Sequence, residues 1–147
     1  MRVACFGGSF NPPHVGHAMV AAWCLWTERV DEVCIIPAFV HAFDKALAPF
    51  PRRLAACEAL AALLGPRARA LDIEAHLPRP SFTVNTLDAL AEAHPDARLQ
   101  LVLGADNLDS LKKWKNWERI QSAYAPIVVG RGCHDVPGVP TFPDVSS

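Results

Sequence analysis

Near its start the chain reads RVACFGGSFNPPHVGHAMVAAWCLW, residues 2–26, and this stretch decides the fold. Its apolar beginning, Arg2–Phe6, ends at two glycines and predicts a buried strand. The part after the prolines is continuous, proline-free and rich in alanine, and it predicts a helix over Val15–Glu28. A strand, a glycine turn and a helix in this order are typical of folds in which helices connect the strands of a parallel sheet.

The rest of the chain repeats this alternation. Further strands are predicted at Glu32–Pro37, Ala70–Glu74, Arg98–Leu103 and Pro126–Gly130, and helices at Pro51–Leu64 and Thr86–His94. In the helix over 51–64, the apolar spacing assigns Arg52, Arg53 and Glu58 to the polar face. Because right-handed crossovers join parallel strands, we expect an α/β fold, a doubly wound parallel sheet, in a single domain over residues 1–147.

Ligands of such sheets bind beyond the carboxyl ends of the strands. The segments that follow the predicted strands there are Gly7–His17, Pro37–Lys45, Gly104–Asp106 and Gly130–Arg131. These four segments are where we expect the functional residues to lie.

The composition is ordinary for a globular protein, with 51% hydrophobic and 20% charged residues among 147. A formal net charge of -1 argues against nucleic acid or an anionic membrane as a partner. No apolar run approaches the ~18 residues that a membrane-spanning helix needs. Glycines and prolines interrupt the apolar N-terminus before it could serve as a secretion signal. The sequence therefore predicts a cytoplasmic protein without nucleic-acid or membrane partners.

Cysteine usage supports the same location. The five cysteines, Cys5, Cys24, Cys34, Cys57 and Cys133, form no CxxC pair. An odd number without paired spacing predicts neither a disulfide framework nor a zinc site, so we expect reduced thiols. Cys5 and Cys34 lie inside apolar runs and are expected in the core.

The turn GGSFNPPHVGH, residues 7–17, carries the chemistry. It lies where backbone N–H groups and the helix dipole favour phosphate, and its glycines let a ligand approach the backbone closely. It matches neither GxGxxG nor GxxxxGK[ST]. His14 and His17 are three residues apart across the helix start, so both can donate hydrogen bonds to the oxygens of a transferring phosphoryl group.

Two simpler interpretations of this turn stay open. A Gly-Gly turn after a strand is common and need not bind phosphate. A histidine pair at this spacing could also hold a metal ion. Because no glutamate or third ligand lies nearby, we expect no protein-bound metal.

Residues 7–17 resemble the GxFxPxHxGH-like signature of the HxGH nucleotidyltransferase superfamily. Its members transfer a nucleotidyl group from a nucleoside triphosphate to a phosphate-bearing acceptor and release pyrophosphate. Three later segments are similar to motifs of bacterial nicotinate-mononucleotide adenylyltransferases. PSFTVNTL (residues 80–87) resembles PSYTYDTL, GADN (104–107) with WKNW (114–117) resembles GADN…WKNW, and VSS (145–147) resembles the start of ISSTxIR.

The resemblance implies a Rossmann-like nucleotidyltransferase fold. It also implies adenylyl transfer from ATP to nicotinate mononucleotide, which gives deamido-NAD and pyrophosphate in NAD biosynthesis, with Mg2+ screening the triphosphate. The implied catalytic residues are His14, His17 and Lys45. Those implied for the nucleotide are Gly7, Gly8, Ser9, Phe10, Gly16, Gly104, Asp106, Arg131 and Ser146. Those implied for the pyridine mononucleotide are Ser81, Thr83, Asn85, Thr86 and Trp117.

Several of these residues also have structural interpretations. Asp106 can accept both ribose hydroxyls or can cap a following helix. The hydroxyls of residues 81–86 can hold a carboxylate or phosphate, or cap the helix before Leu87. Trp117 offers a face for the pyridine ring, whereas Trp114 at helical spacing is expected in the core. Lysines around these tryptophans could indicate single-stranded nucleic acid, but the balanced charge argues against it. His41 and Arg53 also match basic positions of the family.

The chain departs from the family pattern in two places. Val84-Asn85 replaces the usual Tyr-Asp, and the chain stops at Ser147, before the Thr and Arg of ISSTxIR. We therefore expect residues 1–147 to be a nucleotidyltransferase domain that is truncated at its C-terminus. A related transferase with another acceptor, such as phosphopantetheine, and a non-catalytic nucleotide-binding member remain as alternatives.

Overall fold

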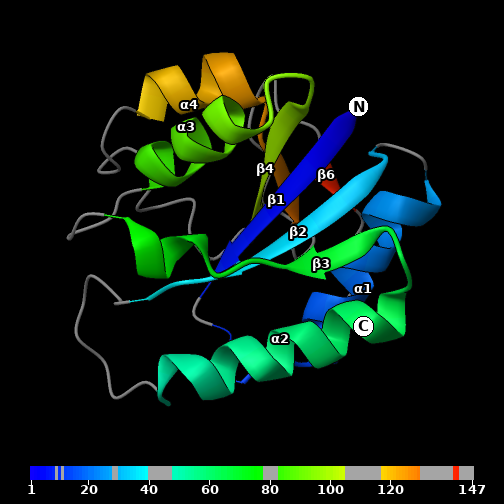
Figure 1. The fold of residues 1–147 in the computed structure, drawn as a ribbon. Coiled ribbons are helices and arrows are strands. Elements are labelled where there is room, and N and C mark those ends of the chain that lie inside the picture. The colour runs from blue at the N-terminus through cyan, green and yellow to red at the C-terminus, as the bar shows by residue number, and fades with distance from the viewer. Residues whose placement is uncertain are drawn as a thin grey trace.

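The computed structural model describes residues 1–8, 10, 12–27, 30–39, 48–77, 83–104, 117–129 and 141–142. Within these residues a six-stranded parallel sheet has the strand order β3-β2-β1-β4-β5-β6 (Figure 1). The strands are β1 (Arg2–Gly8), β2 (Glu32–Pro37), β3 (Ala68–Ala70), β4 (Arg98–Gly104), β5 (Ile127–Val129) and β6 (Thr141–Phe142). The helices are α1 (Val15–Trp26), α2 (Phe50–Leu64), α3 (Thr83–Ala93), α4 (Trp117–Tyr124) and the 3-10 helix η1 (Ile73–His76).

Helices cover both faces of the sheet, α1 and α2 on one side and α3 and α4 on the other (Figure 1). Side chains alternate along β1 accordingly. Ala4 and Phe6 pack with α1 and α2, while Val3 and Cys5 pack with α3 and α4. Burial on both faces explains why the central strands are continuous apolar runs. The predicted doubly wound parallel sheet is confirmed.

The strand order reverses between β1 and β4, which places the ligand crevice of the fold at their carboxyl ends. Gly8 pairs with Pro37 on one side of β1, and Phe6 pairs with Val102 on the other. Gly104 at the end of β4 therefore lies level with Gly8. The first two predicted functional segments begin at this edge of the sheet.

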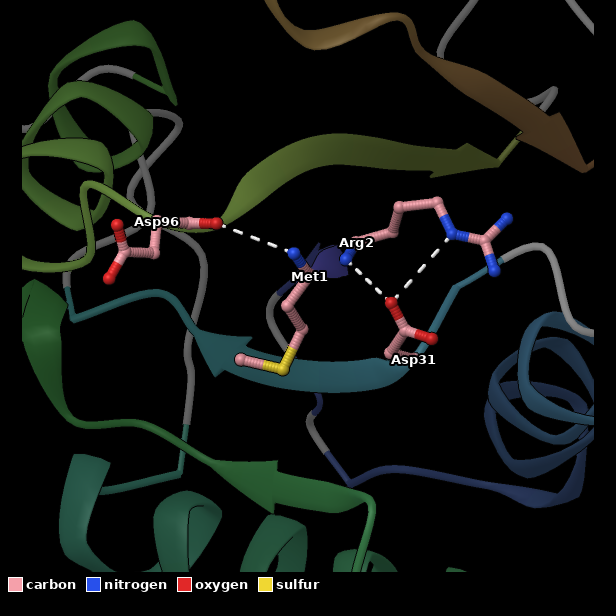
Figure 2. Close-up of polar contacts among 4 residues, drawn as sticks. All are labelled: Met1, Arg2, Asp31 and Asp96. Carbon is pink, nitrogen blue, oxygen red and sulfur yellow. Dashed lines mark hydrogen bonds and ion pairs between the residues drawn. The ribbon is translucent and has the colours of Figure 1, made fainter.

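The amino end of β1 is held by polar contacts (Figure 2). The backbone N–H of Arg2 donates to Asp31 Oδ2 at 2.8 Å, and the Arg2 Nε lies 3.7 Å from the same oxygen. The hydrogen bond from the Arg2 backbone is the main cause of a lowered pKa of the Asp31 carboxyl. The Met1 ammonium group donates to the carbonyl of Asp96 at 3.4 Å. These contacts tie β1 to the start of β2 and to the segment before β4.

Three predicted elements need correction. β1 continues through Gly7 and Gly8, because both glycines still pair with β2. The third strand is Ala68–Ala70 and not Ala70–Glu74. It ends early because Ala75 donates its N–H to the Asp72 carbonyl, which starts η1. α3 begins at Thr83, three residues before the predicted start, and ends at Ala93.

The helix predicted over Val15–Glu28 is confirmed as far as Trp26, and Glu28 lies outside the described residues. The helix predicted over 51–64 starts one residue earlier, at Phe50. The strands at Glu32–Pro37 and Arg98–Leu103 are confirmed, and β5 occupies Ile127–Val129 of the predicted 126–130. No described helix is long and apolar enough to cross a membrane.

The structure describes four of the cysteines, Cys5, Cys24, Cys34 and Cys57; all four are buried, and no disulfide joins any two of them. Burial raises the pKa of Cys5 to about 12 and that of Cys34 to about 11. These two thiols face each other in the β1–β2 register and are protonated core residues. Cys133 lies outside the described residues.

Candidate functional site

The central strand ends in an open turn at the carboxyl edge of the sheet. Gly7 and Gly8 are exposed, whereas Val3 to Phe6 are buried. Phe10 follows with a φ of 46°, a left-handed conformation that is uncommon outside glycine, and its side chain is only 2% exposed. The buried aromatic ring anchors this strained residue.

Phe10 also supports the second histidine. Its ring makes an edge-to-face contact with His17 at 4.8 Å between centroids and another with Phe6 at 5.4 Å. The His17 ring in turn stacks on the His14 ring at 3.8 Å. The His14 and His17 rings are therefore held together by stacking, and the Phe10 ring supports them through its contact with His17.

The two histidines form a reciprocal cap at the start of α1. His14 is the N-cap, and its Nδ1 accepts the backbone N–H of Gly16 at 3.0 Å. His17 reaches back, and its Nδ1 accepts the backbone N–H of His14 at 2.9 Å. This arrangement is the geometry of a capping box, with imidazoles in place of the usual Ser or Thr and Glu.

This cap fixes the orientation of each ring. A nitrogen that accepts a backbone N–H carries no proton, so a neutral ring must hold its hydrogen on Nε2. Among the residues that the structure describes, none hydrogen-bonds to either Nε2. Both rings can therefore direct an N–H donor to a ligand, and the first turn of α1 contains no acidic residue that would repel an anion.

His17 is neutral at physiological pH. Burial, and then the neighbouring His14 ring, lower the pKa of His17 to about 4. A second proton would also remove the acceptor that binds the His14 backbone. His17 is thus a neutral hydrogen-bond donor and not an imidazolium ion.

Gly16 is required by the His14 ring. A Cβ at Gly16 would lie 2.8 Å from Cε1 and 3.0 Å from Nδ1 of His14. A larger residue would push the imidazole off the backbone N–H that it caps. At Gly7, in contrast, the nearest atom to an added Cβ would be 3.9 Å away. The glycine between the two histidines is therefore a steric requirement of the cap, whereas Gly7 is open to a ligand.

The prediction that Arg53 lies on the polar face of α2 is wrong. Its side chain is buried, with 3% exposure, and donates to the carbonyls of Ala38 at 2.6 Å, Phe39 at 3.4 Å and Ala48 at 2.8 Å. The guanidinium also lies over the Phe50 ring at 5.6 Å. Burial lowers its pKa. Arg52 and Glu58 are exposed, as predicted.

Arg53 consequently connects the segment that precedes residues 40–47 with the segment that follows them. Ala38 in turn donates its N–H to the carbonyl of Gly8 at 2.9 Å. The buried Arg53 guanidinium is thereby connected, through the single residue Ala38, to Gly8 at the end of β1. The family match predicted a basic residue here, but not that its role is internal.

The predicted acceptor residues lie on α3 and α4. Thr83 and Asn85 are in the first turn of α3, with Asn85 exposed. Thr86 is buried, and its hydroxyl donates to the Glu74 carboxylate of η1. Trp117 begins α4 and packs, partly buried, against the core cluster of α3 and α4.

The fold thus brings some predicted residues together and leaves others untested. Gly7, Gly8, Phe10, His14, Gly16 and His17 form one constellation at the carboxyl end of β1, with Gly104 at the end of β4. Ser9, His41, Lys45, Ser81, Asp106, Trp114, Arg131 and Ser146 lie outside the described residues. Glu74 was missed, because a contact with Thr86 across 12 residues has no local sequence signal.

The fold and the histidine cap together point to the class of nucleotidyltransferases, as the signature predicts. A family model described as cytidylyltransferase-like matches residues 5–147, and the chain belongs to this cytidylyltransferase-like family. The chain is also 47% identical over 149 residues to the probable nicotinate-nucleotide adenylyltransferase of Anaeromyxobacter sp. (strain K). That alignment covers 99% of this chain and 80% of the relative.

Other comparisons agree. The probable nicotinate-nucleotide adenylyltransferase of Myxococcus xanthus (strain DK1622) is 39% identical, with 100% of this chain and 78% of the relative covered. Plasmodium falciparum nicotinic acid mononucleotide adenylyltransferase complexed with NaAD superposes with a TM-score of 0.82 at 20% identity, over 99% of this chain and 76% of that one. The predicted family resemblance and the Rossmann-like nucleotidyltransferase fold are confirmed.

Proposed function

We propose that this chain transfers the adenylyl group of ATP to nicotinate mononucleotide, giving deamido-NAD and pyrophosphate. The observation that carries the proposal is the reciprocal histidine cap at the carboxyl end of β1, which presents two Nε2 donors beside an open glycine turn. The relatives named nicotinate-nucleotide adenylyltransferase support the reaction, at up to 48% identity across nearly the whole chain. The reaction belongs to NAD biosynthesis.

The proposed chemistry is a direct in-line transfer. An oxygen of the mononucleotide phosphate forms a bond to the α-phosphorus of ATP, and the bond from that phosphorus to the oxygen bridging to the β-phosphorus breaks. Pyrophosphate leaves with the bonding electrons. Both reactants are already anionic phosphates, so the protein needs no nucleophile of its own and contributes positioning and charge stabilisation.

His14 and His17 would donate Nε2–H groups to the α-phosphate oxygens, where negative charge redistributes during transfer. The backbone of Gly7, Gly8 and Phe10, joined by Ser9, would hold the phosphates, and Gly16 keeps the cap in shape. The remaining nucleotide contacts, from Lys45, Gly104, Asp106, Arg131 and Ser146, are assigned by the family resemblance. These contacts are part of the proposal; of the five residues, the structure describes Gly104, at the end of β4.

For the acceptor, we propose that Trp117 stacks on the pyridine ring while Ser81, Thr83 and Asn85 hold its polar groups. Thr86 would act indirectly, because its hydroxyl donates to Glu74. Asn85 is exposed in the first turn of α3, where the family usually has an aspartate. Without that negative charge, nothing at this position repels a nicotinate carboxylate, so we expect the acid form of the mononucleotide to bind.

We propose Mg2+ as the cofactor, bound through ATP. Mg2+ favours oxygen ligands and commonly binds through substrate phosphates together with water. Among the described residues there is no group of three His, Cys, Asp or Glu side chains that could hold a metal ion. A metal held by the triphosphate would neutralise charge on the leaving pyrophosphate. A cytoplasmic location stays a prediction of the sequence.

The test is a pyrophosphate-release assay with ATP, Mg2+ and a series of acceptors. We expect release with nicotinate mononucleotide, weaker release with nicotinamide mononucleotide, and none without an acceptor or with excess EDTA. Release only with phosphopantetheine would favour another transferase of the same family. ATP binding without release on any acceptor would favour a non-catalytic nucleotide-binding protein, and the proposal would then be wrong.

A further inference from the structure

One carboxylate connects the two helices that carry the proposed acceptor residues. Asp88 lies on α3, and its Oδ2 accepts a hydrogen bond from the Arg119 guanidinium at 2.5 Å. Its Oδ1 accepts a hydrogen bond from the Tyr124 hydroxyl at 2.5 Å. Both donors belong to α4, one near its first turn and one at its last residue. Asp88 thus binds α4 at both ends.

The charge states of Asp88, Arg119 and Tyr124 favour the hydrogen bonds among them. Burial acts to raise the pKa of Asp88, but hydrogen bonds from Arg119 and Tyr124 outweigh it, so the pKa is lowered overall. Burial and the hydrogen bond to Asp88 raise the pKa of Tyr124 to about 12. At physiological pH an ionised carboxylate therefore accepts from a guanidinium and from a protonated phenol, and hydrogen bonds to ionised groups are the stronger kind.

The hydrogen bonds to Asp88 are directional, whereas the apolar interface between α3 and α4 is not. Ile120 and Tyr124 of α4 pack into one core cluster with Leu87 and Leu90 of α3. This packing buries one face of the eight-residue helix, but because apolar contacts are non-directional it sets the inward face of α4 more than its register along α3. Two hydrogen bonds to one carboxylate, from residues five positions apart, fix both the rotation and the register of α4.

The placement of Asp88 gives this contact a functional consequence. Asp88 comes two residues after Thr86, and Arg119 comes two residues after Trp117. α3 and α4 contact each other over the same face of the sheet (Figure 1). The Asp88–Arg119 pair therefore lies within one helical turn of both halves of the proposed acceptor site, Asn85 on α3 and Trp117 on α4.

We propose that Asp88 is a positioning residue for the mononucleotide: by holding Arg119 and Tyr124, it sets Trp117 against the first turn of α3. This inference rests on the proposed function, in which those two elements bind the acceptor. Asp88 touches neither substrate and acts through Trp117. None of the sequence motifs of the chain includes Asp88, Arg119 or Tyr124.

The test compares Asp88→Asn with Glu92→Gln in steady-state pyrophosphate release. Glu92 is an exposed acid one turn further along α3 and serves as the matched control. We expect Asp88→Asn to raise the KM for nicotinate mononucleotide by about tenfold, the order expected for a displaced binding group, with the KM for ATP changed less than about twofold. Glu92→Gln should leave both KM values within about twofold.

A double-mutant cycle separates positioning from general stability. If Asp88 acts through Trp117, Asp88→Asn in a Trp117→Ala background should add less than about twofold to the KM for the mononucleotide. Tyr124→Phe, which removes one of the two hydrogen bonds and keeps the ring, should change the same KM in the same direction by a smaller factor. This second variant provides the test if Asp88→Asn does not fold.

Three results would overturn the inference. An Asp88→Asn enzyme with the KM values of Glu92→Gln would show that the contact does not position the acceptor. An effect that is fully additive with Trp117→Ala, or equal on both KM values, would show a general structural role. Wild-type protein that transfers to no pyridine mononucleotide would overturn the proposed function and this inference together, which distinguishes that failure from the first two.

Discussion

The two ends of β1 differ in how their polar groups are used. At the amino end, Asp31 binds both the backbone and the side chain of Arg2 (Figure 2). The carbonyl of Met1 also accepts the N–H of Arg98 at 2.6 Å. At the carboxyl end, two glycines are exposed, and the imidazoles of His14 and His17 each bind the backbone through one nitrogen only.

The amino end of β1 therefore contributes to stability, whereas the carboxyl end also presents groups to a ligand. The contacts at the amino end are internal and hold neighbouring segments in register. The cap at the carboxyl end stabilises α1 with Nδ1 and leaves Nε2 for a ligand, so the same two side chains serve both purposes. Substitutions at either end of β1, or at residues that support it, therefore distinguish effects on turnover from effects on stability.

The largest effect is expected for His17→Ala. Removing a donor aimed at charge in the transition state typically lowers turnover by at least ~100-fold. We expect that loss in kcat for adenylyl transfer, with a smaller change in ATP binding. Asp31→Asn is the control at the opposite end of β1, and it should leave kcat within about twofold, because it removes only an exposed contact. If His17→Ala retains turnover within a few-fold, His17 is only a cap.

Arg53→Met should lower the free energy of unfolding by about 2 kcal/mol, because it leaves partly buried carbonyls without their donor. The neighbouring Arg52→Met keeps the same change in charge on an exposed side chain and should cost less than about 0.5 kcal/mol. Urea denaturation of both variants measures the difference. Equal losses of stability would contradict the internal role of Arg53.

Gly16→Ala should lower kcat by roughly tenfold by displacing the His14 ring, whose Cε1 would lie 2.8 Å from the new Cβ. The same substitution in a His14→Ala background should have little further effect, since the ring that it displaces is absent. Steady-state kinetics of the two single variants and the double variant complete the cycle. Independent, multiplicative losses would mean that Gly16 does not act through His14.

A smaller effect is expected in the pH dependence of stability. The pKa of His17 is lowered from 6.5 to about 4, so the unfolded chain takes up its proton first as the pH falls. The stability that comes from keeping His17 neutral is fully present above 6.5 and is lost as the pH falls from 6.5 through about 4. Urea denaturation at about pH 7 and about pH 4.5 should show a smaller decrease for His17→Ala than for wild type. The same decrease in both proteins would mean that His17 does not cause the loss of stability at low pH.

Much of this molecule could be predicted from its sequence. Strands buried on both faces are continuous apolar runs, and the glycine turn with its two histidines stands between the first strand and helix. The sequence could not show that the imidazoles bind the backbone through Nδ1, because that contact depends on the φ of His14 and on the ring of Phe10. Nor could the sequence show β6, because this strand is only two residues long; it pairs with β5.

Arg53 shows a different limit. Arg53, Cys57 and Ala61 recur every four residues, which is the spacing of a buried helical stripe, and all three are buried. The charge of Arg53 argued against including it, because arginine is rarely buried without partners. Its partners are backbone carbonyls before and after residues 40–47, and no local pattern reveals them. The hydrogen bond between Thr86 and Glu74 was not predictable for the same reason.

The central claim is that His14 and His17 present Nε2–H donors to a transferring phosphate, and nitrogen-15 NMR of the histidine rings tests it most directly. At about pH 7 we expect the proton on Nε2 and none on Nδ1 of His14 and of His17, since Nδ1 accepts a backbone N–H in each. Adding ATP with Mg2+ should shift the Nε2 signals and leave the Nδ1 signals nearly unchanged. Protons on Nδ1, or Nε2 signals that do not respond to ATP, would contradict the account.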